Sequence, residues 1–70
     1  MYNVNLTLTA YELTNECVTG FKVFKDGEQV ATIEQRNNEW IGAIMLGVKV
    51  MMFTHEKFDF VLNKINVLTN

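Results

Sequence analysis

Residues 21–33 read FKVFKDGEQVATI and predict a β-hairpin. Two apolar runs with strand-forming side chains flank Asp26-Gly27, and this dipeptide supplies the positive φ angles that a tight hairpin turn requires. The register stays open at this point. A two-residue loop pairs Val23 with Val30, whereas a three-residue loop with a bulge pairs Lys22 with Val30.

Further strands are predicted on both sides of this hairpin. Residues 1–11 alternate apolar and polar side chains without a charge, and a period of two is typical of a half-buried strand. Residues 12–17 are polar and predict a turn. A second turn is expected at Arg36–Glu39, where two Asn residues tolerate a left-handed backbone. The segments Trp40 to Leu46 and Val48 to Phe53 then predict two more strands.

The first predicted strand has no residue that would guard a sheet edge. Edge strands usually carry Lys, Glu or Pro, which block pairing with another chain, and here the first such residue is Glu12. We therefore expect this strand either to lie between two neighbours of its own sheet or to pair with another molecule.

The C-terminal segment predicts an amphipathic helix. Thr54 is the expected N-cap, and Glu56 lies in the first turn, where a negative charge stabilises the positive end of the helix dipole. An apolar stripe about 120° wide is formed by Phe58, Val61, Leu62, Ile65 and Leu68. Phe60 and Val67 lie roughly opposite this stripe and form a second ridge, which we expect to contact another chain.

The predicted fold is α+β: an antiparallel β-meander of four or five strands with one C-terminal amphipathic helix packed on one face. The 70 residues form a single domain, 1–70, and a chain of this size buries only about 60% of its unfolded surface. Cys17 is the only cysteine and His55 the only histidine, so an internal disulfide is excluded and a zinc site is not expected. Regular packing or self-association must then supply stability, and we expect a homodimer.

Charge and hydropathy restrict the classes of function. The net charge of −2 and the isoelectric point of about 5.2 disfavour a nucleic-acid partner. No secretory signal follows Met1, and the free thiol fits a reducing compartment, so a cytoplasmic protein is expected. The most apolar stretch, Trp40 to Phe53, is shorter than the about 20 residues of a membrane span. We therefore expect no membrane association and assign this stretch to the core.

No catalytic, cofactor or metal site is predicted. His55 has no positioned partner in the sequence pattern, and Cys17 lies near Glu12 and Glu16 rather than near a cation that would activate a thiolate. The carboxylates around the predicted turns lack the spacing of a calcium loop and form either a solvated rim or an acidic patch for a basic partner. These carboxylates are Asp26, Glu28, Glu34 and Glu39.

In size, cytoplasmic composition, the hairpin from Val23 to Ile33 and the terminal amphipathic helix, the chain resembles the small intracellular accessory proteins of phages and mobile elements. This resemblance implies a short β-meander with one helix that binds a host protein stoichiometrically. We expect a non-catalytic protein-binding module that inhibits or neutralises a host protein, as an anti-defence protein or an antitoxin does.

Two alternatives remain from the sequence. The first is a sheet that binds nucleic acid by stacking bases on Tyr11, Phe24 or Trp40. The second is a purely structural homo-oligomer. The candidate interface residues are Tyr2, Tyr11, Phe24, Asp26, Glu28, Arg36, Trp40, Phe60 and Val67.

Overall fold

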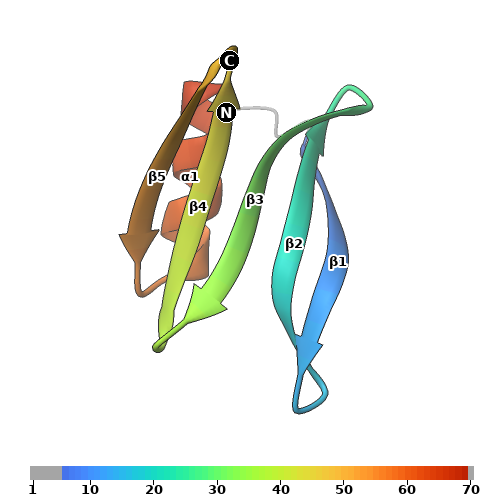
Figure 1. The fold of residues 1–70 in the computed structure, drawn as a ribbon, viewed down its shortest axis with the longest axis vertical. Coiled ribbons are helices and arrows are strands. Elements are labelled where there is room, and N and C mark those ends of the chain that lie inside the picture. The colour runs from blue at the N-terminus through green and yellow to red at the C-terminus, as the bar shows by residue number, and fades with distance from the viewer. Residues whose placement is uncertain (1–5, 70) are drawn as a thin grey trace.

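The computed structural model describes residues 6–69, which form a five-stranded antiparallel sheet and one C-terminal helix (Figure 1). The elements are β1 (Leu6–Thr14), β2 (Cys17–Lys25), β3 (Glu28–Arg36), β4 (Glu39–Leu46), β5 (Lys49–His55) and α1 (Phe58–Leu68). The strands follow one another in the sheet in the order β1-β2-β3-β4-β5. The predicted meander with a helix on one face is therefore confirmed.

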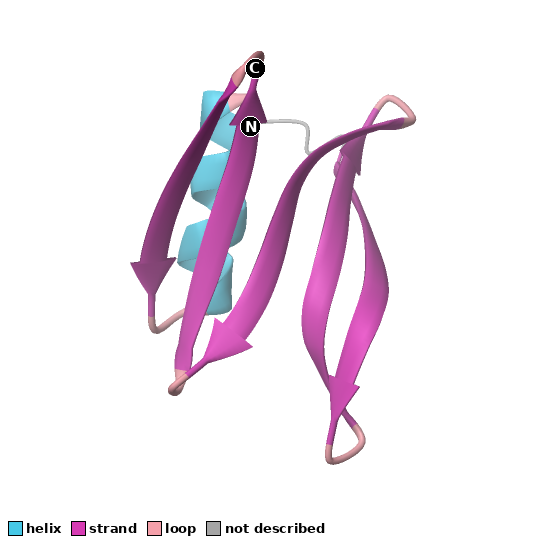
Figure 2. Cartoon of the chain, in the orientation of Figure 1, coloured by secondary structure: helices cyan, strands magenta, loops and turns pink. Residues whose placement is uncertain are grey.

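Two-residue turns join all neighbouring strands (Figure 2). Three of them have positive φ at both central residues, the geometry of a type I′ turn, whose twist matches that of the strands. They are Asn15-Glu16, Asp26-Gly27 and Asn37-Asn38. The fourth turn begins with Gly47, also at positive φ, as a type II′ turn requires. Local turn chemistry thus fixes where each strand ends.

The register of the central hairpin differs from both predicted registers. The Asp26-Gly27 loop has two residues, as in the first prediction, and Lys25 lies opposite Glu28. Val23, however, pairs with Ala31 rather than with Val30, because Val30 is an extra residue in β3 that forms a bulge. Predictions from turn length alone are wrong here, since the bulge arises within the strand.

The first strand extends further along the chain than predicted. Part of the predicted strand, residues 1–5, lies outside the described residues. At its other end β1 continues to Thr14, so the prediction of a turn over residues 12–17 is wrong. Only Asn15 and Glu16 form the turn. The polar residue Glu12 is accommodated in the sheet because it accepts hydrogen bonds from Thr19 and Arg36 and lies at a bulge.

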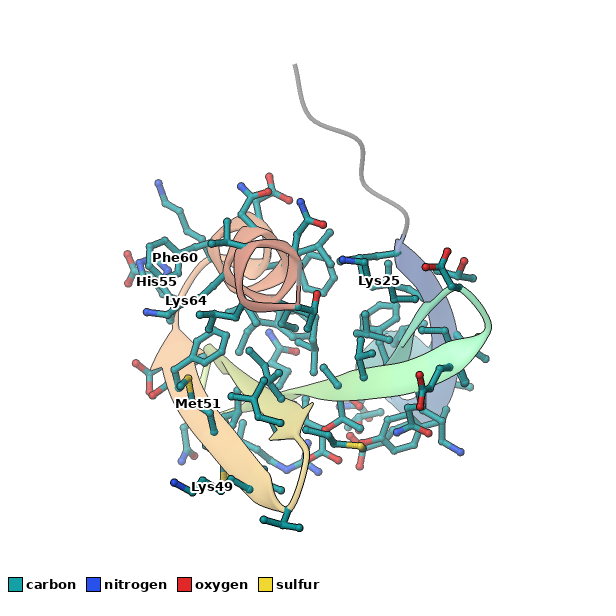
Figure 3. The ribbon with its side chains drawn as sticks, turned by 90° about the horizontal axis from the view of Figure 1, so that it is seen from above. Lys25, Lys49, Met51, His55, Phe60 and Lys64 are labelled. Carbon is teal, nitrogen blue, oxygen red and sulfur yellow. The ribbon has the colours of Figure 1, made fainter. Side chains whose placement is uncertain are left out.

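The hydrophobic core lies between α1 and the sheet face that α1 covers, which we call the inner face (Figure 3). Its fully buried side chains are Val23, Ala31, Ile33, Ile44, Val61 and Ile65. The predicted apolar stripe of the helix therefore does face the sheet. Gly42 is a further requirement of this contact, because a Cβ atom there would lie 2.9 Å from Cγ1 of Val61.

The helix begins later than predicted. Thr54 is not an N-cap but a residue of β5, where it pairs with Ile41. The N-cap is Lys57, whose side chain makes no capping hydrogen bond. The imidazole Nδ1 of His55 accepts the backbone N–H of Lys57 at 3.0 Å, so the end of β5 satisfies the N–H of the N-cap residue itself, the group that an N3 side chain satisfies in a capping box.

Candidate interaction site

The tip of the β4–β5 hairpin exposes large apolar side chains on both of its faces. They are Met45, Leu46, Val48, Val50, Met51 and Met52. The assignment of the whole stretch from Trp40 to Phe53 to the core is therefore wrong for its second half. The physical reason is that a single helix covers only the inner face and does not reach the hairpin tip.

Within residues 6–69, β1 and β5 are the two edge strands of the sheet. The first strand therefore does not lie between two neighbours, which removes one of the two predicted alternatives. An edge strand presents the backbone N–H and C=O groups of alternate residues to the outside. The residue pairs that flank each turn determine which residues of β1 and β5 present these groups away from the sheet.

The outward groups of β5 belong to Val50, Met52 and Thr54. Leu46 lies opposite Lys49 across the two-residue turn between β4 and β5. The residues that flank such a turn form a hydrogen-bonded pair, so the backbone groups of Lys49 point toward β4. Because successive residues alternate, the backbone groups of every second residue after Lys49 also point toward β4, and those between them point away.

The backbone groups of β1 that point away from the sheet are identified by the same alternation. Thr7 and Thr9 lie opposite Phe24 and Lys22. The turn after β2 directs the backbone groups of Lys25 toward β3, so those of Phe24 and Lys22 point toward β1 and pair with the two threonines. The residues whose backbone groups point away from the sheet are Leu6, Leu8 and Ala10.

A cluster of aromatic and cationic side chains lies where α1 runs beside β5 (Figure 3). The rings of His55 and Phe60 are stacked with centroids 3.9 Å apart. Lys64 Nζ lies 5.3 Å from the ring centroid of Phe53 and 5.9 Å from that of Phe60. Phe60 is 45% exposed and Val67 is 68% exposed, so the ridge opposite the buried stripe does face outward. Its contact with another chain stays a prediction.

A polar network ties β1 to β3 across β2 on the outer face, the face away from α1. The hydroxyl of Tyr11 donates a hydrogen bond to Glu34. The two guanidinium NH groups of Arg36 donate to the two carboxylate oxygens of Glu12 at 2.9 and 3.0 Å, and Thr19 donates to the same carboxylate at 3.0 Å. These groups are satisfied by one another at the β1 bulge.

The network also shifts the ionisation of two of its members. Desolvation, followed by the hydrogen bond to Glu34, raises the pKa of Tyr11 to about 12. The hydrogen bonds from Arg36 and then from Thr19 hold the pKa of Glu12 below its ordinary value. Tyr11 is therefore neutral and Glu12 ionised near pH 7, the states that the hydrogen bonds require.

The structure does not bring the predicted interface residues together into one surface. Tyr2 lies outside the described residues. Tyr11 and Arg36 belong to the outer-face network, whereas Asp26 and Glu28 are exposed at the β2–β3 turn.

Trp40 and Phe24 occupy two further environments. Trp40 is half-buried in an aromatic cluster, with its ring centroid 5.0 Å from that of Phe58 and 6.3 Å from that of Phe21, and so contributes to packing. Phe24 is half-buried on the outer face.

The sequence does not predict that the tip of the β4–β5 hairpin is exposed. The apolar residues on both faces of the predicted strand from Val48 to Phe53 are the signal that could have indicated it.

Comparisons of the chain with protein-family models, with curated proteins and with solved structures give no match. Among residues 6–69, no three His, Cys, Asp or Glu side chains are grouped as metal ligands would be. In the same part of the chain, the one helix is too short to cross a bilayer. The function is argued below from the edges and the exposed side chains.

Proposed function

We propose that this protein is a non-catalytic binding module that inhibits or neutralises a host protein in a stoichiometric complex, as phage and mobile-element accessory proteins do. In this proposal β1 is the docking strand, to which an extended segment of the partner adds as a further strand. The observation that supports it is that β1 is an edge strand with neither a charge nor a proline between Leu6 and Tyr11.

Backbone hydrogen bonds would supply the affinity of such a complex. In strand addition the main chain of the edge binds the main chain of the partner, and alternate side chains give specificity. The available groups are those of Leu6, Leu8 and Ala10. The bulge at Tyr11 and Glu12 ends the regular pairing of β1, so the partner strand is expected to pair with residues 6–10.

The charge distribution favours a basic partner segment. Residues 6–38, which form β1 to β3 and the turn that follows, hold three basic and five acidic side chains, a net charge of −2. Residues 39–69 hold three basic and three acidic side chains and are neutral. The exposed carboxylates of Asp26 and Glu28 lie at the turn that faces the beginning of β1, since Leu6 is opposite Lys25. Complementary charge accelerates association and makes it sensitive to salt.

The test is capture of the partner from nuclease-treated host lysate by the tagged protein and by its Ala10→Pro variant. Proline at position 10 removes an outward N–H and leaves the β1–β2 hydrogen bonds in place, as is tolerated at a sheet edge. We expect one protein to be recovered in stoichiometric amount by the wild type, to be lost with Ala10→Pro, and to be recovered less at high salt. Val50→Pro, which removes an outward N–H from the opposite edge, is the matched control and should retain the partner.

Two results would contradict the proposal. Full recovery of the partner by a folded Ala10→Pro variant would show that β1 is not the docking strand. Recovery of a partner from untreated lysate, and its loss after nuclease treatment, would instead support the sheet as a nucleic-acid-binding surface.

A further inference from the structure

The second edge strand, β5, is more regular than β1 and more apolar. Its pairing with β4 runs from Trp40–His55 to Leu46–Lys49 without a register shift, whereas the pairing of β1 is interrupted by shifts. Val50 and Met52 are 62% and 66% exposed on the outer face, and Met51 is 40% exposed on the inner face. Charges, prolines or bulges usually guard such an edge, and the described part of β5 has none of them between Lys49 and His55.

We propose that β5 pairs with β5 of a second copy of this chain, antiparallel and about a twofold axis at Met52. Only this register pairs the three outward-pointing residues with one another. Met52 lies opposite Met52 of the second copy, and Val50 lies opposite Thr54 of the second copy. Each of these pairs exchanges two backbone hydrogen bonds. The dimer is closed, because a twofold axis uses the same edge of both copies.

The side chains brought opposite one another in this register are compatible on both faces. On the outer face the two Met52 side chains meet at the axis, and thioethers pack readily against each other because they are flexible and polarisable. On the inner face Met51 meets Phe53 of the second copy. Lys49 lies opposite His55 of the second copy, and both are polar side chains at the margin of the contact.

The helix extends the contact beyond the two strands. A stable interface buries at least about 1,000 Å² in total, so side chains beyond the strand backbones must take part. Phe60 and Lys64 lie on the side of α1 that is above β5 (Figure 3), and pairing of the edges places the two helices on the same side of the joined sheet. Phe60 stacks on His55, so Lys49 of the second copy is the strand residue that lies opposite this stacked pair.

The mass of the protein in solution tests the dimer. At tens of micromolar, sedimentation equilibrium of the wild type should give the mass of two chains. Met52→Lys places two ammonium groups opposite each other at the axis, and like charges directly opposite are destabilising. We expect it to raise the dissociation constant at least about 100-fold.

Met45→Lys is the matched control for this variant. Met45 is 44% exposed on the same face as Met52, but it lies on β4 rather than at the edge. The control introduces the same charge and should leave the dimer intact. Circular dichroism of both variants checks that the chain remains folded.

Disulfide formation tests the register, in a Cys17→Ser background that removes the exposed native thiol. In a hydrogen-bonded antiparallel pair the Cα atoms are about 5.5 Å apart, within the range of about 4.4–6.8 Å that a disulfide spans. Met52→Cys should therefore cross-link two chains on mild oxidation. Cysteines at position 50 of the two copies would be about 13 Å apart, at about 3.3 Å per residue, so Val50→Cys should not cross-link.

Three results would overturn the proposal. The first is a wild type that stays monomeric up to about 100 μM. The second is cross-linking at position 50 without cross-linking at position 52, which would indicate another register. The third is a mass that grows beyond two chains with concentration, which would indicate an open head-to-tail chain through β5 and β1. None of these results affects the Ala10→Pro test of partner binding, so the two proposals can fail separately.

Discussion

The contact between α1 and β4 at Gly42 gives the sharpest prediction about stability. A Cβ atom at this position would lie 2.8 Å from Cζ of Phe53 and 2.9 Å from Cγ1 of Val61. The Phe53 ring is half-exposed and can move, whereas Val61 is fully buried and its β-branched side chain has essentially one rotamer in a helix. Gly42→Ala should therefore displace α1 from the sheet rather than only a side chain.

The expected cost is the difference between two effects. Overpacking a filled core costs about 1–3 kcal/mol, and replacing Gly by Ala recovers about 0.4–1 kcal/mol through the entropy of the unfolded chain. We expect Gly42→Ala to lower the free energy of unfolding by about 1–2 kcal/mol. In a domain of this size each kcal/mol lowers the melting temperature by about 4–8 °C.

A double-mutant cycle with Val61→Ala identifies the cause. Val61→Ala alone should cost about 2 kcal/mol through lost burial and the cavity that it leaves. In the double variant the removed methyl groups make room for the new Cβ atom, so the combined cost should be smaller than the sum by at least about 1 kcal/mol. The unfolding of the wild type, the two single variants and the double variant in urea should be measured at the same protein concentration. Association of the chains would otherwise add to the apparent stability by different amounts. A neutral Gly42→Ala, or costs that add within about 0.5 kcal/mol, would refute the reasoning.

Three further predictions concern the polar network and the start of the helix. Arg36 lowers the pKa of Glu12 in the folded protein. The stabilisation from this pair is therefore present above the pKa of Glu in the unfolded chain, about 4.3, and is lost as the pH falls through the pKa of Glu12 in the folded protein. Glu12→Gln should flatten the acid side of the profile of melting temperature against pH, and an unchanged profile would count against the pairing. The pKa of Tyr11 is raised to about 12, so its contribution is present below pH 10 and is lost as pH rises toward 12. Tyr11→Phe should remove the phenolate absorbance step near pH 12, and persistence of that step would assign it to another group. His55→Ala removes the acceptor at the start of α1 and the stack on Phe60, and should cost about 1 kcal/mol in urea unfolding; an unaltered midpoint would contradict this role.

The parts of the fold that local chemistry determines were predicted from the sequence. Asp26-Gly27 and Asn37-Asn38 do form tight turns with positive φ, because these residues tolerate that backbone region better than others. The stripe of the helix was also predictable, since the spacing of its apolar residues decides which side can be buried. Alternation placed Met51 and Met52 on opposite faces of one strand, as observed.

The features that depend on distant residues were not predictable in the same way. Glu12 remains in β1 because of Arg36, 24 residues away in the chain. The bulge at Val30 is a property of two paired strands rather than of the turn between them. Thr54 would be a favourable N-cap in isolation, but pairing with Ile41 keeps it in β5. The exposure of the hairpin tip depends on how much of the sheet α1 covers.

The order of the strands in the sheet, which equals their order in the chain, has a consequence for folding. Each hairpin closes between segments that are adjacent in sequence, and α1 packs on β4 and β5, the two strands that precede it. Topologies with such local contacts fold faster than those that must first close long loops. During folding the four hairpins can close before α1 docks, while the side chains of Val23, Ile33 and Ile44 still face water. The folding chain is therefore most prone to aggregate before α1 docks, and docking of α1 ends that interval.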